Sequence, residues 1–544
     1  MALTPWQVAI TENSLCIMYV LQPESNIWEK VLIFSFVRGS RHGGLPDSRS
    51  GKYHNGHGFR GRYATVVVRF GTSFGWWIRV HSPKPPHQMA EFTGSLASYS
   101  ARWSFFTYLG AIAVGTGLLA LPAARAPAQP PLTLVDAAFT ATSACCVTGL
   151  TVRSTVEDFS PFGQGVILVL IQLGGLGIMT ITTLLIFQIG GEATVRQRAV
   201  IADTLGIKSA QGLRQLALMV LVVVLSAELI GFLLLTAVTW GSREPFDVIW
   251  RAAFHSVSAF CNAGFSLGDD SLVAYSTDIP VNLIICGLVI VGGLGFPVLF
   301  DILSRLWNRE SLWDRLHMHS KLMLLGTAAL LAFGAVSFWV FESDGVLAGQ
   351  PLSNRILFGL FHTTTCRTAG FHTVEYGSLS SATLFLTILL MAIGAGPGST
   401  GGGFKVSTFM TLLTRAGASF RGQERANFAK RTIPERAVER ATATALVFVA
   451  IAFVALVALL GVESGGMAAE RPRWFLDASF ECISALGTVG LSTGITASLT
   501  IPGKFILAIL MLLGRLGPIT VAVALSRQRP AYQPNYPEEE PLVG

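Results

Sequence analysis

The chain has 544 residues and a formal net charge of +7, and 51% of its residues are hydrophobic while only 13% are charged. Soluble domains carry about a quarter charged residues, so this composition excludes an ordinary soluble protein. Apolar runs of about 20 residues recur, and such runs cross the hydrocarbon core of a bilayer as helices. A transmembrane β-barrel would instead alternate apolar and polar residues. We therefore predict an all-α polytopic membrane protein.

Neither the charge nor the cysteines indicate a soluble partner or a cofactor. In a membrane protein a basic balance reports topology first, and no basic stripe interleaved with aromatic residues marks a nucleic-acid surface. The chain has seven cysteines, none with the C-x-x-C spacing of a metal site. We interpret them as small apolar residues in packed segments. We expect no nucleic-acid partner and no cofactor.

Residues 1–100 differ in composition from the rest of the chain. Arg38–Arg62 is rich in Gly, Arg, His and Ser, and the apolar pieces Val31–Val37 and Ala64–Val68 are too short to span a bilayer. We interpret this region as an extension that is poorly ordered or lies outside the native product, with translation starting at Met89. A small cytoplasmic or interfacial module is the alternative.

After residue 100 the chain divides into four similar units. Each is expected to hold a long outer helix, a short helix, a glycine-centred stretch and a second long helix. The short helices cannot span and suit re-entrant segments, so we predict about eight transmembrane helices around one pseudo-fourfold axis. The units are repeat 1 at 101–192, repeat 2 at 193–308, repeat 3 at 309–416 with a gating loop, and repeat 4 at 417–526, before a cytoplasmic tail at 527–544.

The helices are expected in the same order in every repeat. The outer helices are predicted at Ser104–Pro122, Leu213–Trp240, Lys321–Phe341 and Arg436–Val462. The short helices are predicted at Thr133–Cys145, Phe246–Phe260, Pro351–Thr365 and Arg473–Ala485. The second long helices are predicted at Phe162–Ile189, Val281–Leu306, Ala382–Arg415 and Pro502–Ser526.

Four glycine stretches organise these repeats. Their glycines lie 115, 106 and 120 residues apart, and a phenylalanine (Phe139, Phe254, Phe361 or Phe480) precedes each by nine or ten residues. Near-constant spacing of one unit indicates an internal repeat, and we expect the four stretches to form one ring. The ring residues are Val147, Thr148, Gly149, Asn262, Ala263, Gly264, Thr368, Ala369, Gly370, Thr488, Val489 and Gly490.

A ring of this kind predicts a cation pore. Non-helical backbone at membrane depth is tolerated only where it is buried in protein or lines a watery cavity, and a ring of carbonyl oxygens can replace a cation's hydration shell. Glycine reaches positive φ without penalty, and the short helices aim their negative dipole ends at the axis. The stretches lack Asp and Glu, which favours a monovalent ion over Ca²⁺ or Mg²⁺. A repeat used only for packing is the alternative.

Repeat 3 departs from the others through a glycine-rich interruption of its second long helix. No ordinary helix runs through such a segment, and broken helices near the midplane recur in transporters. We expect a movable gating loop below the ring, with a static kink as the alternative. The gating loop comprises Gly394, Gly396, Pro397, Gly398, Ser399, Thr400, Gly401, Gly402, Gly403 and Lys405.

Repeat 4 departs from the others at Arg515. The other second helices carry a glycine motif at Gly174–Gly177 and Gly292–Gly295, which we interpret as close helix packing through small residues. In Gly514–Gly517 the second glycine is replaced by Arg515. A cation inside an apolar helix is functional by default, so we predict that Arg515 raises the barrier to cations below the ring. A buried structural pair with a helix C-terminus or a carboxylate is the alternative.

Lys and Arg gather in the loops that follow each repeat and in the tail, which marks those segments as cytoplasmic. The ring then faces outward and both termini lie in the cytosol.

From about residue 100 to its end the chain resembles the Trk/Ktr/HKT superfamily of potassium transporters, and within it the bacterial Ktr membrane subunit. The motifs that carry the resemblance are Val147–Leu150, Asn262–Phe265, Arg367–Phe371, Thr488–Leu491, Gly396–Gly403, Gly514–Gly517 and Tyr536–Glu539. The resemblance implies potassium uptake across the cytoplasmic membrane, with K⁺ held at the four ring glycines. Glycine at position 149 matches the potassium-selective pattern of that superfamily. A homodimer with one pore per subunit and a cytosolic nucleotide-binding regulatory ring are also implied, and Na⁺ stays open as an activator.

Two other functions stay open at this point. A sodium-coupled potassium symporter can share the same fold. An intramembrane enzyme would draw on His255 and His362, which occupy nearly equivalent places in two repeats. These histidines lack an adjacent Glu or a third ligand, so satisfied helix histidines explain them better.

Overall fold

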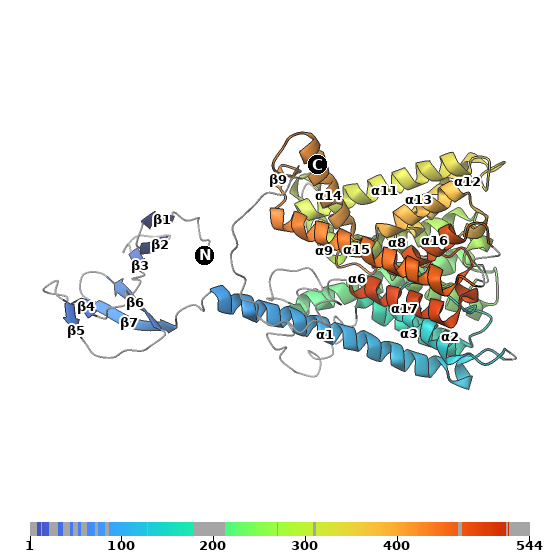
Figure 1. Cartoon of the computed structure of the whole chain (residues 1–544), viewed down its shortest axis with the longest axis horizontal. Helices are drawn as coiled ribbons and strands as arrows, with labels where there is room; N and C mark the ends of the chain where they lie inside the picture. The colour runs from blue at the N-terminus through green and yellow to red at the C-terminus, as the bar shows by residue number, and fades with distance from the viewer. Residues whose placement is uncertain are drawn as a thin grey trace. The chain divides into compact units, whose positions relative to one another are not determined.

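The computed structural model describes residues 86–127, 129–177, 213–268, 270–307, 312–465, 471–517 and 521, together with seven strands between residues 8 and 81. The chain divides into two compact units, Met1–Thr93 and Gly94–Gly544. Figure 1 shows the helices of the second unit, which carry the glycine stretches.

Met1–Thr93 holds the strands. β1 (Val8–Thr11), β2 (Ser14–Val20), β3 (Val31–Ser35), β6 (Tyr63–Phe70) and β7 (Phe74–His81) pair antiparallel in the order β1-β2-β3-β6-β7. A separate pair joins β4 (Gly44–Pro46) and β5 (Tyr53–Asn55). The apolar pieces that are too short to span thus supply β3 and β6. That translation starts at Met89 stays a prediction.

The predicted order of helices recurs in all four repeats. The outer helices are α1 (Pro86–Leu119), α6 (Leu213–Thr239), α11 (Met318–Glu342) and α15 (Glu435–Val462). The short helices are α2 (Leu134–Cys145), α7 (Pro245–Phe260), α12 (Leu352–Thr365) and α16 (Trp474–Gly487). The second helices are α3 (Pro161–Leu176), α8 (Ile279–Leu294) with α9 (Phe296–Trp307), α13 (Ser381–Ala392) with α14 (Val406–Phe420), and α17 (Ile501–Leu516).

The remaining described elements are short. They are α10 (Leu312–Arg315), the hairpin strands β8 (Asn427–Phe428) and β9 (Arg431–Thr432), and the 3₁₀ turns Pro122–Ala124, Val273–Tyr275, Tyr376–Ser378 and Thr496–Ser498.

The repeats close on themselves in a cycle. The second helix of each repeat packs on the short helix of the next: α3 on α7, α8 on α12, α13 on α16, and α17 back on α2. Phe139, Phe254, Phe361 and Phe480 are almost fully buried in these contacts. Burying a side chain of this size contributes about 1.5–3 kcal/mol each. The matched phenylalanines are therefore core residues that fix each short helix.

Apolar helices place the chain in a membrane. Among the described residues three helices are long and apolar enough to cross a bilayer: Leu218–Thr239, Met318–Glu342 and Glu435–Val462. The bent pair α8 and α9 is either a broken fourth span or a re-entrant segment. That there are eight transmembrane helices stays a prediction.

The continuous helix predicted over Val281–Leu306 is wrong. The helix breaks at Gly295, and α8 and α9 meet at 100°. Gly295 has φ +98°, a backbone conformation that residues with a side chain rarely adopt. The N–H of the next residue, Phe296, donates to the carbonyl of Gly398 instead of continuing the helix. The last glycine of the repeated motif therefore stops the helix, whereas we had interpreted the whole motif as a packing surface. The same stop occurs at Gly177 and Gly517, where α3 and α17 end.

The packing interpretation holds for the first glycines of the motif. A Cβ on Gly174, Gly292 or Gly514 would collide with the backbone oxygen of Cys145, Phe260 or Leu486, near the end of a short helix. The motif thus combines close approach at its start with helix termination at its end.

Candidate functional site

Each short helix ends in a backbone conformation that repeats around the molecule. The residue two positions before each ring glycine has positive φ: Val147 at 55°, Asn262 at 59°, Thr368 at 71° and Thr488 at 52°. The glycines themselves have φ between 72° and 97°. Positive φ at a branched residue such as Val147 costs about 1–3 kcal/mol and persists only where the surroundings enforce it. Four matched instances indicate a shared functional geometry.

The structure brings the four ring glycines together in sequence order. A Cβ on Gly149 would lie 2.5 Å from the carbonyl oxygen of Ala263, and one on Gly264 would lie 2.9 Å from that of Ala369. A Cβ on Gly370 would lie 2.6 Å from the oxygen of Val489. One on Gly490 would collide with the oxygen of Thr148, which closes the ring. Only glycine fits such an approach.

The carbonyl oxygens that meet the glycines are free for a ligand. They belong to Thr148, Ala263, Ala369 and Val489, all of which are buried. Within the described part of the chain none of these oxygens accepts a hydrogen bond. Buried carbonyl groups are normally paired, so four unpaired ones around one point form a site suited to a dehydrated cation.

Four hydroxyl residues hold the stretches in place, and we had not singled them out. Gly149 N–H and Gly490 N–H donate to the hydroxyls of Ser143 and Ser484, each at 3.1 Å. Ser258, Thr365 and Ser484 donate to the carbonyls just after their glycines, those of Phe265, Phe371 and Leu491. A signal was available, because a Ser or Thr lies four residues after every matched phenylalanine.

The gating loop lies against the ring. The Thr400 hydroxyl donates to the Phe260 carbonyl at the end of α7, and Gly402 N–H donates to the Thr488 hydroxyl at 3.1 Å. A Cβ on Gly401 would collide with the Thr368 side chain. The loop thus contacts repeats 2 and 4 as well as the third glycine stretch, which belongs to its own repeat.

Backbone bonds also tie the gating loop to the helix ends. Gly396 N–H donates to the Gly293 carbonyl at 2.8 Å, Phe296 N–H donates to the Gly398 carbonyl at 2.8 Å, and Gly403 N–H reaches the Gly514 carbonyl at 3.4 Å. Lys405 turns back on the loop, and its Nζ donates to the carbonyls of Gly401 and Gly402 at 2.8 and 3.2 Å.

Arg515 joins the gating loop to repeat 1. Its guanidinium donates to the carbonyls of Thr400 in the loop and Gly174 near the end of α3. Its Nε also lies 3.3 Å from the Tyr108 hydroxyl on α1. The contact with Gly174 is the helix C-terminus partner that the structural alternative for Arg515 predicts. The contact with Thr400 also joins Arg515 to the gating loop. Both contacts hold the positive charge of Arg515 between the gating loop and the end of α3.

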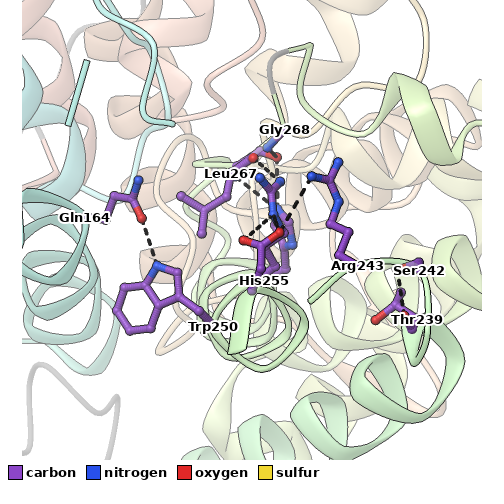
Figure 2. Close-up of polar contacts among 11 residues, drawn as sticks. Gln164, Thr239, Ser242, Arg243, Trp250, His255, Leu267 and Gly268 are labelled. Atoms are coloured by element: carbon purple, nitrogen blue, oxygen red, sulfur yellow. Dashed lines mark hydrogen bonds and ion pairs between the residues drawn. The ribbon is translucent and has the colours of Figure 1, made fainter. Parts of the chain in front are cut away.

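Salt bridges and hydrogen bonds join the repeats at the other end of the short helices. Lys504 at the start of α17 lies 3.0 Å from the Asp136 carboxylate on α2, and Arg153 lies 3.4 Å from it. Trp250 on α7 donates to Gln164 on α3 at 2.8 Å (Figure 2). These contacts stabilise the short helices α2 and α7 against the second helices α17 and α3 of the neighbouring repeats.

The two histidines of the enzyme hypothesis are satisfied helix residues. His255 accepts the Leu267 N–H at 3.2 Å, and His362 lies 3.0 Å from the Tyr376 hydroxyl. Among the described residues no group of three or more His, Cys, Asp and Glu side chains could hold a metal ion. Six of the seven cysteines are buried free thiols, as predicted for packing: Cys145, Cys146, Cys261, Cys286, Cys366 and Cys482.

Comparison with known proteins assigns the family. The family model TrkH, described as "Cation transport protein", matches residues 111–534. The chain belongs to the TrkH family. The expected relationship to the Trk/Ktr superfamily is therefore confirmed. Since the family consists of transport proteins, it also excludes the intramembrane enzyme.

The relatives of this TrkH-family chain are potassium uptake proteins by name. The Ktr system potassium uptake protein B of Vibrio alginolyticus is 37% identical over 441 residues, which cover 80% of this chain and 93% of the relative. Its namesake from Bacillus subtilis is 36% identical over 435 residues, or 80% and 94%. The potassium/sodium uptake protein NtpJ of Enterococcus hirae is 37% identical over 413 residues, or 75% and 90%.

A solved structure shows the same fold. The potassium transporter TrkH from Vibrio parahaemolyticus aligns with a TM-score of 0.62 at 19% identity, covering 78% of this chain and 84% of that one.

Proposed function

We propose that this TrkH-family protein takes up K⁺ through a channel-like pore whose selectivity filter is the ring of four glycine stretches. The observation that carries the proposal is the closed ring of four buried, unpaired carbonyl oxygens, each against the next glycine. K⁺ binds where Gly149, Gly264, Gly370 and Gly490 meet. Relatives named for potassium uptake support this choice of ion.

The gating loop and Arg515 control flow in this proposal. The loop lies beneath the ring, and Arg515 and Lys405 add two positive charges to its backbone. A passing cation must displace the loop and cross that field. Opening therefore requires the bonds from Arg515 to Thr400 and from Gly402 to Thr488 to break.

Family membership and the distribution of charge support a proposed assembly and orientation. The protein lies in the cytoplasmic membrane with about eight spans, the ring facing outward and both termini in the cytosol. We propose a homodimer that works with a cytosolic nucleotide-binding ring, and the name "Ktr system potassium uptake protein B" of two relatives supports a system of more than one subunit. Na⁺ acts as an activator, which the potassium/sodium name of a third relative supports.

Radioactive rubidium uptake by sealed vesicles that hold the purified protein tests the function. Unlabelled K⁺ should compete with the tracer, and Na⁺ at equal concentration should not. Uptake that K⁺ does not compete for would contradict the proposal.

The second candidate is a sodium-coupled potassium symporter, which the name of the Enterococcus relative favours. An imposed Na⁺ gradient with no K⁺ gradient separates the two. A symporter accumulates rubidium against its gradient under that condition, whereas a Na⁺-activated channel only equilibrates it.

A further inference from the structure

Two side chains on α7 reach the segment that follows the second ring glycine. The Arg251 guanidinium donates to the Leu267 carbonyl, and the Leu267 N–H donates to His255 Nε2 at 3.2 Å. Figure 2 shows His255 beside Leu267. Leu267 is only 2% exposed and lies three residues after Gly264. Both backbone polar groups of one residue are therefore held by the short helix that leads into the same glycine stretch.

Arg251 is itself fixed in direction. Its Nε donates to both oxygens of Asp247, one turn back on α7, at 2.9 and 3.0 Å. A planar guanidinium can bind a carboxylate along one edge and a carbonyl with another nitrogen, which a lysine ammonium cannot do over the same span. Arg243 also lies 3.6 Å from Asp247, but its side chain is half exposed. Arg243 thus offers a matched arginine that contacts Asp247 but not Leu267.

The position of His255 has counterparts in the other repeats. It directly follows the matched phenylalanine, and the equivalent residues are Thr140, His362 and Glu481. Glu481 accepts the Ser492 hydroxyl at 2.6 Å and the Thr493 N–H at 3.0 Å, in the segment just after Gly490. His362 holds Tyr376 in the segment after Gly370. The Thr140 hydroxyl has no partner among the described residues.

We propose that Arg251 and His255 form a clamp on Leu267 that sets the outer mouth of the second filter segment, and that they are positioning residues for ion selectivity. The inference rests on the proposed function. Only two residues, Phe265 and Ser266, separate Leu267 from Gly264, so a displaced Leu267 shifts the carbonyl of Ala263 at the ring. Discrimination between K⁺ and Na⁺ depends on the number and spacing of such carbonyls.

The test measures ion selectivity through rubidium uptake by vesicles that hold the protein. Selectivity is the Na⁺ concentration that halves uptake divided by the K⁺ concentration that halves it. In Arg251→Met and His255→Leu we expect this ratio to fall about tenfold, the scale of one lost hydrogen bond to a charged or buried group. His255→Gln should keep the wild-type ratio, because its amide oxygen can accept the Leu267 N–H. Arg243→Ala should also keep it.

The outcomes separate the clamp from the proposed function. Wild-type vesicles without K⁺-competed uptake would overturn the function itself, whereas active wild type with unchanged ratios in Arg251→Met and His255→Leu overturns the clamp alone. Arg251→Lys gives a second measurement if Arg251→Met does not accumulate in membranes. It should also lower the ratio, and an unchanged ratio would overturn the role of Arg251. Failure of His255→Gln to keep the ratio would overturn the hydrogen-bonding role of His255.

Discussion

The ring and the layer directly beneath it follow opposite rules. In the ring, all four repeats share two positive-φ residues, a buried phenylalanine and a supporting hydroxyl. Beneath it, the gating loop occurs in repeat 3 and Arg515 in repeat 4. A spherical ion that sheds its water needs equivalent ligands on every side, whereas a gate needs only one element that moves. In the proposed function, ion binding therefore preserves the symmetry of the repeats, and control of flow breaks it.

Breaking the symmetry of the ring should have the largest effect. In Gly490→Ala the new methyl group meets the Thr148 carbonyl, and alanine must adopt φ near +91°. Strain of about 1–3 kcal/mol corresponds to a fall in rubidium uptake of about tenfold or more. Gly461→Ala on α15 is the matched control, because a Cβ there has nothing within 4 Å. Wild-type uptake by Gly490→Ala would show that the ring is not the filter.

Removing one supporting hydroxyl should have a smaller effect. Ser484→Ala deletes the acceptor of the Gly490 N–H and the donor to the Leu491 carbonyl. A net loss of about 1 kcal/mol should raise the half-saturating K⁺ concentration about fivefold. Ser479→Ala serves as the control, since its hydroxyl bonds only the preceding turn of α16. An equal change in both variants would argue against a filter role for Ser484.

Substitutions at Arg515, in the layer beneath the ring, should raise rubidium uptake rather than lower it. This effect should be the smallest of the three. Arg515→Ala removes the bonds to Thr400 and Gly174 and one of the positive charges below the ring. A partly accessible charge contributes ~0.6 kcal/mol to the barrier for a cation. Removing the charge should therefore raise rubidium uptake about threefold. Arg515→Lys, which keeps the charge but not the planar fork, should rise less. Unchanged flux in Arg515→Ala would exclude the barrier role.

The symmetric parts of the molecule could be predicted from sequence because they recur. The ring glycines and the short helices follow from spacing, since each glycine reports a backbone position that other residues resist. The supporting hydroxyls were missed although they recur too, because Ser and Thr are common in membrane helices and draw no notice singly. The stop at Gly295 was missed because small residues at a packing face and at a helix end look alike in sequence.

The asymmetric contacts could not be predicted in the same way. Arg515 could be singled out as an intramembrane charge, but its partners Thr400, Gly174 and Tyr108 come from three distant segments. The clamp on Leu267 likewise depends on a loop folding back over α7. Both needed coordinates because most of the partners are backbone groups, which leave no mark on residue identity.

The closing contact of the ring joins the first glycine stretch to the last, through Gly490 and Thr148, and the Lys504–Asp136 ion pair joins the same two repeats. During synthesis, three completed repeats leave a gap where the fourth belongs. We therefore expect a nascent or prematurely terminated chain to contain no working filter. If the ring is the proposed filter, the cell is protected from ion leakage while the protein is being made, because conduction begins only when nearly the whole chain has emerged.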